Sequence, residues 1–256
     1  PAALTTASLL LLLGVLPADA REPRDELPPR PRIGLVLSGG GARGAAHVGV
    51  LKVLEEYRVP IDVIVANSMG AIVGGLYAAG MSPQEMIELN EGTDWNEIIL
   101  SDRPPERDVP FRRRGGIDGL GVFEIGFREG KFRFPRGLTA GQRLGFLLEA
   151  LTLHTTGVED FDGLPTAYRA IATDLRTGEA VVLEDGSLAT AMRASMAVPG
   201  VFSPVERDGR LLVDGGLVNS VPASVVRGMG ARVVVGVDLN SDRIVHTRPD
   251  NAFEMF

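Results

Sequence analysis

Short apolar runs and stretches of helical periodicity alternate along the chain from residue 33 onward. Ile33–Leu37 and Val63–Val65 are continuous apolar runs of the length typical of buried strands. A segment with apolar residues at helical spacing follows each run, Ala45–Tyr57 after the first and Met69–Ala79 after the second. Gly80 is placed to end the second helix. Two successive strand–loop–helix units predict a mainly parallel sheet with helices on its faces.

Ser82-Pro83-Gln84-Glu85 has the residues of a capping box and predicts the start of another helix. The alternation of apolar runs and helical stretches then continues to residue 237. Further helices are expected at 139–154, 188–196 and 223–229, and further strands at 166–174, 179–183, 211–213 and 232–237. Residues 103–135 lose this periodicity and are rich in glycine, proline, arginine and phenylalanine. Because long irregular insertions in compact domains are often functional, we expect a lid or a binding loop there.

A serine stands between the second strand and its helix, in the sequence Ala66-Asn67-Ser68-Met69-Gly70. At a tight strand-to-helix turn flanked by small residues, a serine exposes its hydroxyl to a substrate carbonyl, as in the nucleophile elbow of serine hydrolases. The usual pattern is GxSxG, so Ala66 adds one methyl group where strand and helix converge. The alternative is that Ser68 only caps the helix. The strand–turn–helix context favours the nucleophile.

A glycine loop follows the first predicted strand. It matches GxGxxG and consists of Gly39, Gly40, Gly41, Ala42, Arg43 and Gly44. In a dinucleotide-binding protein an acidic residue about 20 positions later holds the ribose, but Asp62 precedes the second strand instead of ending it. A glycine loop at a helix N-terminus also presents several backbone N–H groups to one point, as an oxyanion hole requires. We expect this loop and Ser68 to lie side by side, because each follows one of two successive parallel strands.

A candidate base for Ser68 is Asp214, which ends a predicted apolar strand and precedes two glycines that allow close backbone approach. A carboxylate is a weak base, so it would depend on fixed geometry and on apolar surroundings that raise its basicity. Asp214 could instead be a turn residue. A third arrangement is a triad of Ser68, Asp214 and His246 in the chain order of α/β-hydrolases. His246 lies in a polar run, whereas His47 and His154 fall within or at the end of predicted helices.

The glycine loop, the serine elbow and the Asp214 motif, together with Arg193–Pro199, have the order and approximate spacing found in patatin-like phospholipases. Residues 31–240 resemble this family, and in particular its exported bacterial members. The resemblance implies a patatin-like α/β/α sandwich and hydrolysis of phospholipid acyl esters through an acyl-enzyme, without metal or cofactor. It implies that Ser68 is the nucleophile, Asp214 the base, and the loop from Gly39 to Gly44 the oxyanion hole. Supporting motif positions are Ala66, Gly70, Gly215 and Gly216.

The N-terminal segment has the features of a secretory signal. Leu9–Leu16 is almost entirely leucine and precedes Ala18-Asp19-Ala20, a small-x-small cleavage pattern. The apolar run is shorter than the roughly 20 residues needed to span a bilayer. We therefore expect a signal peptide at 1–20, a linker rich in proline and charge at 21–31, a catalytic domain at 32–240 and a C-terminal segment at 241–256. The protein would be periplasmic, outer-membrane-associated or secreted in a Gram-negative-type bacterium, with an outer-membrane module as a candidate C-terminal continuation.

Composition limits the remaining function classes. A chain of 256 residues with 45% hydrophobic and 23% charged residues can form one large globular domain. The formal net charge of −7 argues against a nucleic-acid partner. The absence of cysteine excludes disulfides, thiolate metal sites and a cysteine nucleophile.

A phospholipid substrate would bring the protein into transient contact with a membrane surface. Arg112–Arg114 follow Phe111 and precede further phenylalanines at 123, 127, 132 and 134. Such a segment could dock on anionic headgroups and insert apolar side chains, or it could be a solvated charge run beside ordinary core residues. The charges and aromatics share no helical period, which favours the second interpretation. The other open alternatives are a non-catalytic lipid- or partner-binding domain and a nicotinamide or flavin oxidoreductase.

Overall fold

A mixed seven-stranded sheet forms the centre of the computed structural model, which describes residues 30–100, 126–128, 131–133, 137–139 and 141–240. The strand order is β11-β1-β2-β6-β10-β9, and β7 also pairs with β6. The strands are β1 (Ile33–Leu37), β2 (Val63–Asn67), β6 (Ala167–Asp174), β7 (Ala180–Leu183), β9 (Val205–Arg207), β10 (Arg210–Asp214) and β11 (Val233–Val237). β11, β1, β2 and β6 are parallel, whereas β10, β9 and β7 are antiparallel to their neighbours. The predicted α/β architecture is confirmed, and the sheet is extended by antiparallel strands.

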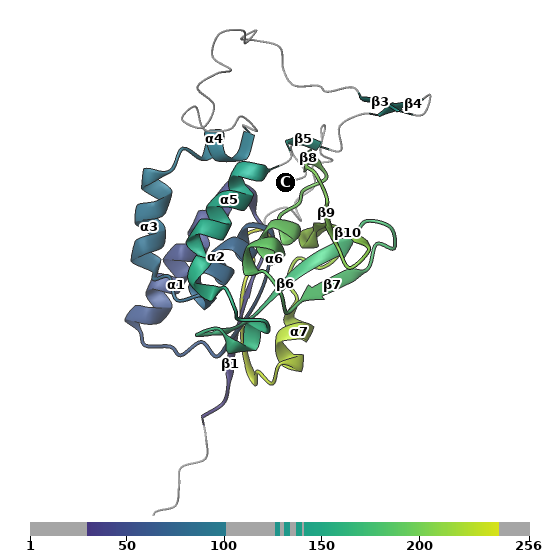
Figure 1. The fold of residues 1–256 in the computed structure, drawn as a ribbon. Helices are drawn as coiled ribbons and strands as arrows, with labels where there is room; N and C mark the ends of the chain where they lie inside the picture. The colour runs from purple at the N-terminus through teal and green to yellow at the C-terminus, as the bar shows by residue number, and fades with distance from the viewer. Residues whose placement is uncertain (1–29, 101–125, 129–130, 134–136, 140, 241–256) are drawn as a thin grey trace, which may run out of the picture. The chain divides into compact units, whose positions relative to one another are not determined.

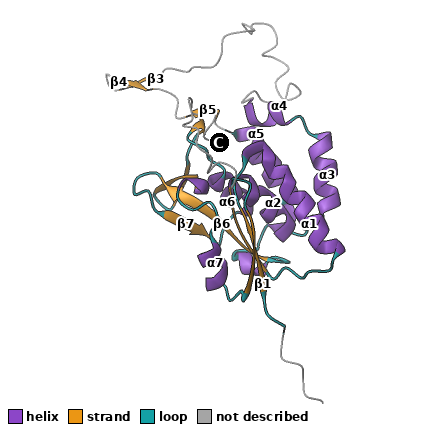
Figure 2. Cartoon of the chain, turned by 180° about the vertical axis from the view of Figure 1, so that it is seen from behind, coloured by secondary structure: helices purple, strands orange, loops and turns teal. Residues whose placement is uncertain are grey.

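Helices cover the two faces of this sheet unequally (Figures 1 and 2). They are α1 (Ala46–Glu56), α2 (Ser68–Ala78), α3 (Pro83–Gly92), α4 (Trp95–Leu100), α5 (Gln142–Leu151), α6 (Leu188–Ser195) and α7 (Ala223–Gly228). Side chains of β1 alternate between the faces: Leu35 and Leu37 join the large core with α1, α2, α3, α5 and α6, whereas Val36 packs with Val226 of α7 in a smaller core. The sheet is therefore buried on both sides, as continuous apolar parallel strands require.

Short elements connect the main layers. They are the 3-10 turns η1 (Gly41–Ala45), η3 (Leu153–Thr155), η4 (Phe161–Gly163) and η5 (Gly215–Leu217), and the strands β3 (Gly126–Arg128), β4 (Lys131–Arg133), β5 (Gly137–Thr139) and β8 (Gly200–Phe202). The expected helix at 139–154 begins only at Gln142, because β5 pairs with β8 and Gly141 breaks the chain direction at φ 68°. Part of the insertion expected to be irregular forms the β3–β4 hairpin.

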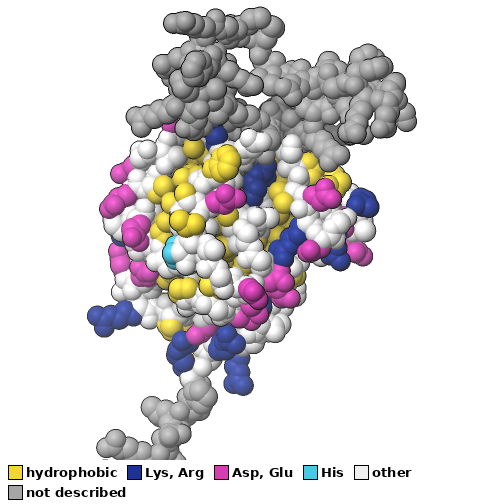
Figure 3. Space-filling view, viewed as in Figure 1, with side chains coloured by type: hydrophobic (Ala, Val, Ile, Leu, Met, Phe, Trp, Pro, Cys, Tyr) yellow, Lys and Arg dark blue, Asp and Glu magenta, His cyan; other side chains and the backbone are white. Residues whose placement is uncertain are grey.

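Several predicted features lie outside the described residues. They are the signal peptide at 1–20, the linker up to residue 29, Arg112–Arg114 with Phe111, Phe123 and Phe134, and the C-terminal segment with His246. Within the described ranges, no helix has both the length and the apolar character that crossing a membrane requires. On the face shown in Figure 3, Lys and Arg side chains are interspersed with Asp and Glu.

Candidate active site

The register of the sheet brings Ser68 and Asp214 together at one edge of β6. Asn67, the last residue of β2, pairs with Ile171, and Asp214, the last residue of β10, pairs with Ala172. Because β7 occupies the opposite edge of β6 over the same stretch, β2 and β10 lie on one edge and run toward each other. Ser68 directly follows β2. The two strands therefore end head to head, with the candidate nucleophile and the candidate base at the junction.

Ser68 has the backbone conformation of a sharp turn. Its φ of 50° lies in the left-handed region that residues other than glycine rarely adopt, and such strain is often found at functional sites. The helix α2 begins at Ser68 itself, and no side chain caps it. The structure therefore shows the strand–turn–helix elbow expected from the sequence rather than a capping serine.

Two glycines let the elbow approach the glycine loop. A Cβ on Gly70 would lie 2.5 Å from the Ser38 carbonyl oxygen and 2.7 Å from that of Leu37, so α2 passes the end of β1 without room for a side chain. A Cβ on Gly39 would lie 3.0 Å from Ser68 Cβ and 3.6 Å from Ser68 Oγ. The loop backbone consequently lies directly against the serine, as expected for an oxyanion hole.

Hydrogen bonds fix the orientation of this loop. The Gly39 carbonyl accepts from Ser38 Oγ at 2.9 Å and from Asn240 Nδ2 at 3.0 Å. In a trans peptide the following N–H, that of Gly40, points the opposite way. Within the described chain, the N–H groups of Gly39 and Gly40 donate to no acceptor. They are therefore available to a developing oxyanion.

The described histidines bond to backbone carbonyls. His47 is fully buried in α1, and its Nε2 lies 2.8 Å from the Ser38 carbonyl oxygen. Burial lowers the pKa of His47, with the carbonyl opposing this effect, so a neutral ring that donates from Nε2 fits best. His154 Nε2 lies 2.9 Å from the Ala79 carbonyl oxygen. His47 thus supports the glycine loop, and His246 lies outside the described residues.

Asp214 is a buried carboxylate beside Ser68. It is only 4% exposed, and its Oδ1 accepts the Gly216 N–H at 2.7 Å. Its buried Oδ2 accepts no hydrogen bond of good geometry from the described residues. Burial raises the pKa of Asp214, while the nearby Ser68 hydroxyl and the Gly216 N–H act in the opposite direction. The result is a desolvated and more basic carboxylate next to a serine hydroxyl.

Gly215 allows the Asp214 turn to lie on the backbone of β6. A Cβ there would be 2.1 Å from the Ile171 carbonyl oxygen, a distance no side chain can adopt. The Asp214 N–H donates to the Ala197 carbonyl at 3.0 Å, and Thr173 Oγ1 donates to the Asp214 carbonyl at 2.8 Å. The main chain of the base is thus fixed by contacts from β6 and from the segment after α6.

Ala66, the departure from the usual elbow pattern, lies inside the core. It is fully buried in the large core. Its methyl group lies 3.4 Å from where a Cβ of Gly74 would stand, which is an ordinary contact distance between β2 and α2. The close helix–strand crossing is instead at Gly70.

The dinucleotide alternative does not fit the position of Asp62. Its Oδ2 accepts the Ile33 N–H at 2.7 Å, at the start of β1. The glycine loop follows the other end of this strand, so Asp62 is too far away to hold a ribose bound there. Among the described residues, no group of three or more His, Asp or Glu side chains is placed to bind a metal ion.

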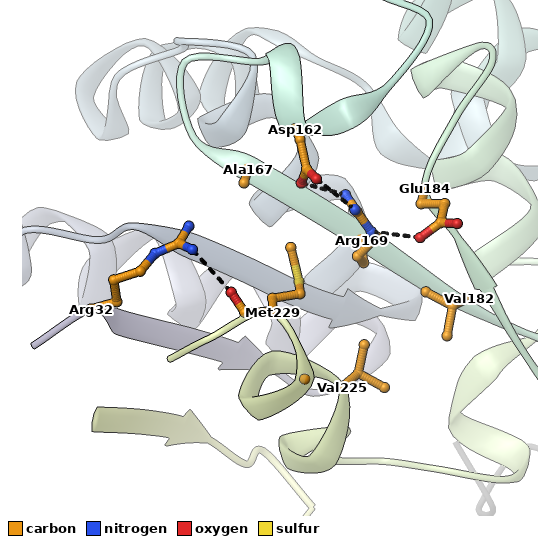
Figure 4. Close-up of a pocket in the computed structure, with 9 residues that line it drawn as sticks. Arg32, Asp162, Ala167, Arg169, Val182, Glu184, Val225 and Met229 are labelled. Carbon is orange, nitrogen blue, oxygen red and sulfur yellow. Dashed lines mark hydrogen bonds and ion pairs between the residues drawn. The ribbon is translucent and has the colours of Figure 1, made fainter. Parts of the chain in front are cut away.

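A cavity of about 680 Å³ lies away from Ser68, near the starts of β1 and β6 (Figure 4). Arg32 on one side donates to the Met229 carbonyl, and Arg169 on the other forms ion pairs with Asp162 and Glu184. The charged groups of this cavity thus have partners within the protein, Arg32 in a backbone carbonyl and Arg169 in two carboxylates. Among the described residues, a strained turn, a buried carboxylate and unbonded backbone donors come together at Ser68, which is therefore a better candidate active site than the cavity.

Fold and site together define an α/β protein with a serine elbow, a buried aspartate and a glycine loop at one edge of the sheet. The chain belongs to the patatin-like phospholipase family, whose model matches residues 35–227. The expected family is therefore confirmed, and its members are lipid hydrolases.

Relatives of this chain occur in bacteria and in animals. An uncharacterized NTE family protein of Mycobacterium tuberculosis is 35% identical over 210 residues, which cover 82% of this chain and 49% of the relative. Human patatin-like phospholipase domain-containing protein 6 is 33% identical over 211 residues, 82% of this chain and 13% of that protein. The chain thus spans about half the length of the mycobacterial relative and a much smaller part of the human one. These matches give no support to the exported bacterial subtype, because they include animal members.

The fold also occurs in a solved structure of low sequence similarity. VipD from Legionella pneumophila matches with a TM-score of 0.53 and 19% identity, over 82% of this chain and 50% of VipD. At this identity the match supports the architecture alone.

Proposed function

We propose that this chain hydrolyses fatty-acyl esters of phospholipids or related lipids, with Ser68 as nucleophile and Asp214 as general base. The main support is the head-to-head meeting of β2 and β10 on β6, which brings a strained serine to a buried carboxylate. Membership of a family of lipid hydrolases supports the substrate class.

The proposed reaction has two steps. Asp214 takes the proton of Ser68 Oγ as this oxygen attacks the ester carbonyl, and then gives the proton to the leaving alcohol. A water molecule, deprotonated by Asp214, next attacks the acyl group on Ser68, and the fatty acid is released with Ser68 protonated again. In both steps the unbonded N–H groups of the glycine loop would stabilise the oxyanion, and one such donor is typically worth about 2.7 to 4 kcal/mol of barrier.

The cellular setting is a separate proposal. The leucine-rich segment and small-x-small pattern at 9–20 support export to the periplasm or beyond. Transient contact with a lipid surface follows from the proposed substrate. Fractionation of cells that express the full gene, with cleavage after Ala20 read by mass spectrometry, would test export.

The catalytic proposal is tested with a short-chain aryl ester and a fluorophosphonate probe. We expect turnover by the wild type and labelling of Ser68, loss of both in Ser68→Ala, and loss of turnover in Asp214→Asn. Ser82→Ala is the control, since Ser82 caps α3 away from the sheet edge. Neither turnover nor labelling in the wild type would favour a non-catalytic binding domain. Loss of activity in His246→Ala together with an active Asp214→Asn would favour the triad.

Lipid specificity needs a separate measurement. Products from defined phospholipids, compared between the wild type and Ser68→Ala, would identify the ester position and headgroup that the enzyme prefers. Fatty acid released by both proteins alike would show a contaminating activity.

A further inference from the structure

Asn67 links the two strand ends that carry the proposed catalytic pair. Its side chain is fully buried, and Nδ2 donates to the Asn219 carbonyl at 2.7 Å and to the Ser220 carbonyl at 2.9 Å. Both carbonyls belong to the segment that follows the Asp214 turn, while Asn67 immediately precedes Ser68 in the chain. One side chain thus joins the backbone of the nucleophile to the loop after the base.

The chemistry of the partners fixes the orientation of the amide. A flipped side chain would place Oδ1 against two carbonyl oxygens, which cannot donate a hydrogen bond. In the observed orientation Oδ1 is buried and receives no hydrogen bond from the described residues. It lies 3.1 Å from the Cβ position of Gly39 and 3.9 Å from that of Gly216. Asn67 therefore lies between the glycine loop and the Asp214 turn. Both of its amide protons are donated to the carbonyls of the 219–220 segment.

The sheet links the two strand ends only through β6. β2 and β10 pair with the neighbouring residues Ile171 and Ala172 of β6, but they meet end to end and share no ladder of their own. Asn67 adds a direct side-chain link across this junction. The distance between Ser68 and Asp214 depends on this junction, and a misplacement of about 1 Å can lower an enzymatic rate by about 100-fold.

We propose that Asn67 is a positioning residue that sets the distance between Ser68 and Asp214 by holding the 219–220 segment with its amide. This inference rests on the proposed function. It assigns Asn67 no contact with the reacting atoms. Its substitution should therefore affect the chemical step and leave substrate binding largely unchanged.

The decisive variant is Asn67→Leu, which keeps the branched shape of the side chain and removes both donors. We expect kcat for a soluble aryl ester to fall about 10- to 100-fold, with KM changed by less than about threefold. The rate of fluorophosphonate labelling at Ser68 should fall in the same proportion as kcat, since both need the serine activated by its base.

Tyr168→Phe is the matched control. The Tyr168 hydroxyl is buried and donates to the Ala71 carbonyl of α2 at 2.8 Å, so its loss also removes a buried hydrogen bond near the elbow helix. We expect a comparable drop in Tm with kcat close to that of the wild type. The inference is overturned if Asn67→Leu keeps at least half of kcat, or if Tyr168→Phe loses as much. A wild type without turnover or labelling refutes the proposed function itself, which distinguishes the two failures.

Discussion

The hydroxyl oxygen of Ser195 accepts a hydrogen bond from the backbone N–H of Ser68 at 3.0 Å. The same hydroxyl donates to the Ile171 carbonyl at 2.5 Å. Ser195 ends α6, so this helix fixes the strained turn at Ser68 to the rung of β6 where β2 ends. The backbone of the nucleophile is therefore held by a hydrogen bond outside the helix it begins.

Substitution of Ser195 by alanine is expected to reduce both stability and activity. It leaves a buried N–H on Ser68 and a buried carbonyl on Ile171 without this partner, and unpaired groups of this kind cost about 1–3 kcal/mol. We expect a lower Tm and a kcat reduced about tenfold, measured by thermal unfolding and ester turnover. Ser187→Ala removes the side chain that caps the start of α6 and should cost about 1 kcal/mol without lowering kcat. Equal kcat in the two variants would contradict the role of Ser195.

A methyl group on Gly70 should disrupt the site. The added Cβ would stand 2.5 Å from a backbone oxygen of Ser38, so α2 and β1 would have to separate. We expect Gly70→Ala to lose most turnover and to unfold at a lower temperature. In Gly49→Ala, by contrast, the Cβ meets nothing within 4 Å, and we expect a gain of about 0.5–1 kcal/mol with normal activity. Circular dichroism melts and ester assays on both variants test this contrast.

Ala66→Gly, which restores the usual elbow pattern, should not accelerate the reaction. The methyl group is buried in the large core and fills space next to Gly74. Its removal leaves a small void and adds backbone freedom, so we expect a loss of about 1 kcal/mol and kcat within about twofold of the wild type. A severalfold increase in kcat would show instead that the methyl hinders Ser68.

The stability of the protein should depend on pH through Asp214. Burial raises the pKa of Asp214 in the folded state, so the folded state holds this proton more tightly than the unfolded state. Stability is consequently lost as pH rises from the ordinary aspartate value of about 3.9 through the raised folded value. We expect Asp214→Asn to be more stable than the wild type at neutral pH, and this gain to vanish at pH values below about 3.9.

The activity of the wild type should follow the same titration. The base must be deprotonated, so the acidic limb of kcat/KM is expected above the ordinary pKa of aspartate. Urea unfolding across pH and a pH–rate profile test the two statements. An Asp214→Asn variant less stable than the wild type at neutral pH would contradict the argument.

His47 should make the protein sensitive to mild acid. Burial lowers its pKa, so the unfolded state binds a proton more readily and stability declines as pH falls below about 6.5. His47→Gln can still donate to the Ser38 carbonyl but does not titrate. We expect a flatter pH dependence of Tm between pH 7 and pH 5 in this variant. An unchanged slope would mean that another group dominates this range.

The sequence predicted the central strands and their helices well, because each has a strong local signal. The apolar runs at β1 and β2 and the capping box at Ser82 appear in the structure as expected. The predicted start of the helix at residue 139 was wrong, because residues 137–139 form β5 instead. The pairing of β5 with β8 joins segments about 60 residues apart and leaves no local pattern in the sequence. The strand predicted at 211–213 is confirmed within β10, whereas its antiparallel pairing and the short strand β9 depend on a tertiary arrangement.

The candidate site was predicted as a set of motifs, but its supporting residues were not. Ser68, Asp214 and the glycine loop carry recognisable neighbours, and the structure brings them to one sheet edge. Ser195 was noted only as part of a family-like stretch, and Asn240 had no signal, since it bonds to Gly39 from 201 positions away. Polar side chains that hold a backbone from such distances are found only from coordinates.

The bond between Asn240 and Gly39 also means that the glycine loop, which lies early in the chain, is anchored only after the residues that follow β11 have been synthesised. β1 lies between β2 and β11, and the glycine loop takes its anchor from the residues just after β11. A nascent chain that carries Ser68 and Asp214 but stops before Val233 would have both reactive groups and an unanchored loop. Such ribosome-bound chains should not react with a fluorophosphonate, so we expect labelling of Ser68 to begin only after residue 240 has left the ribosome.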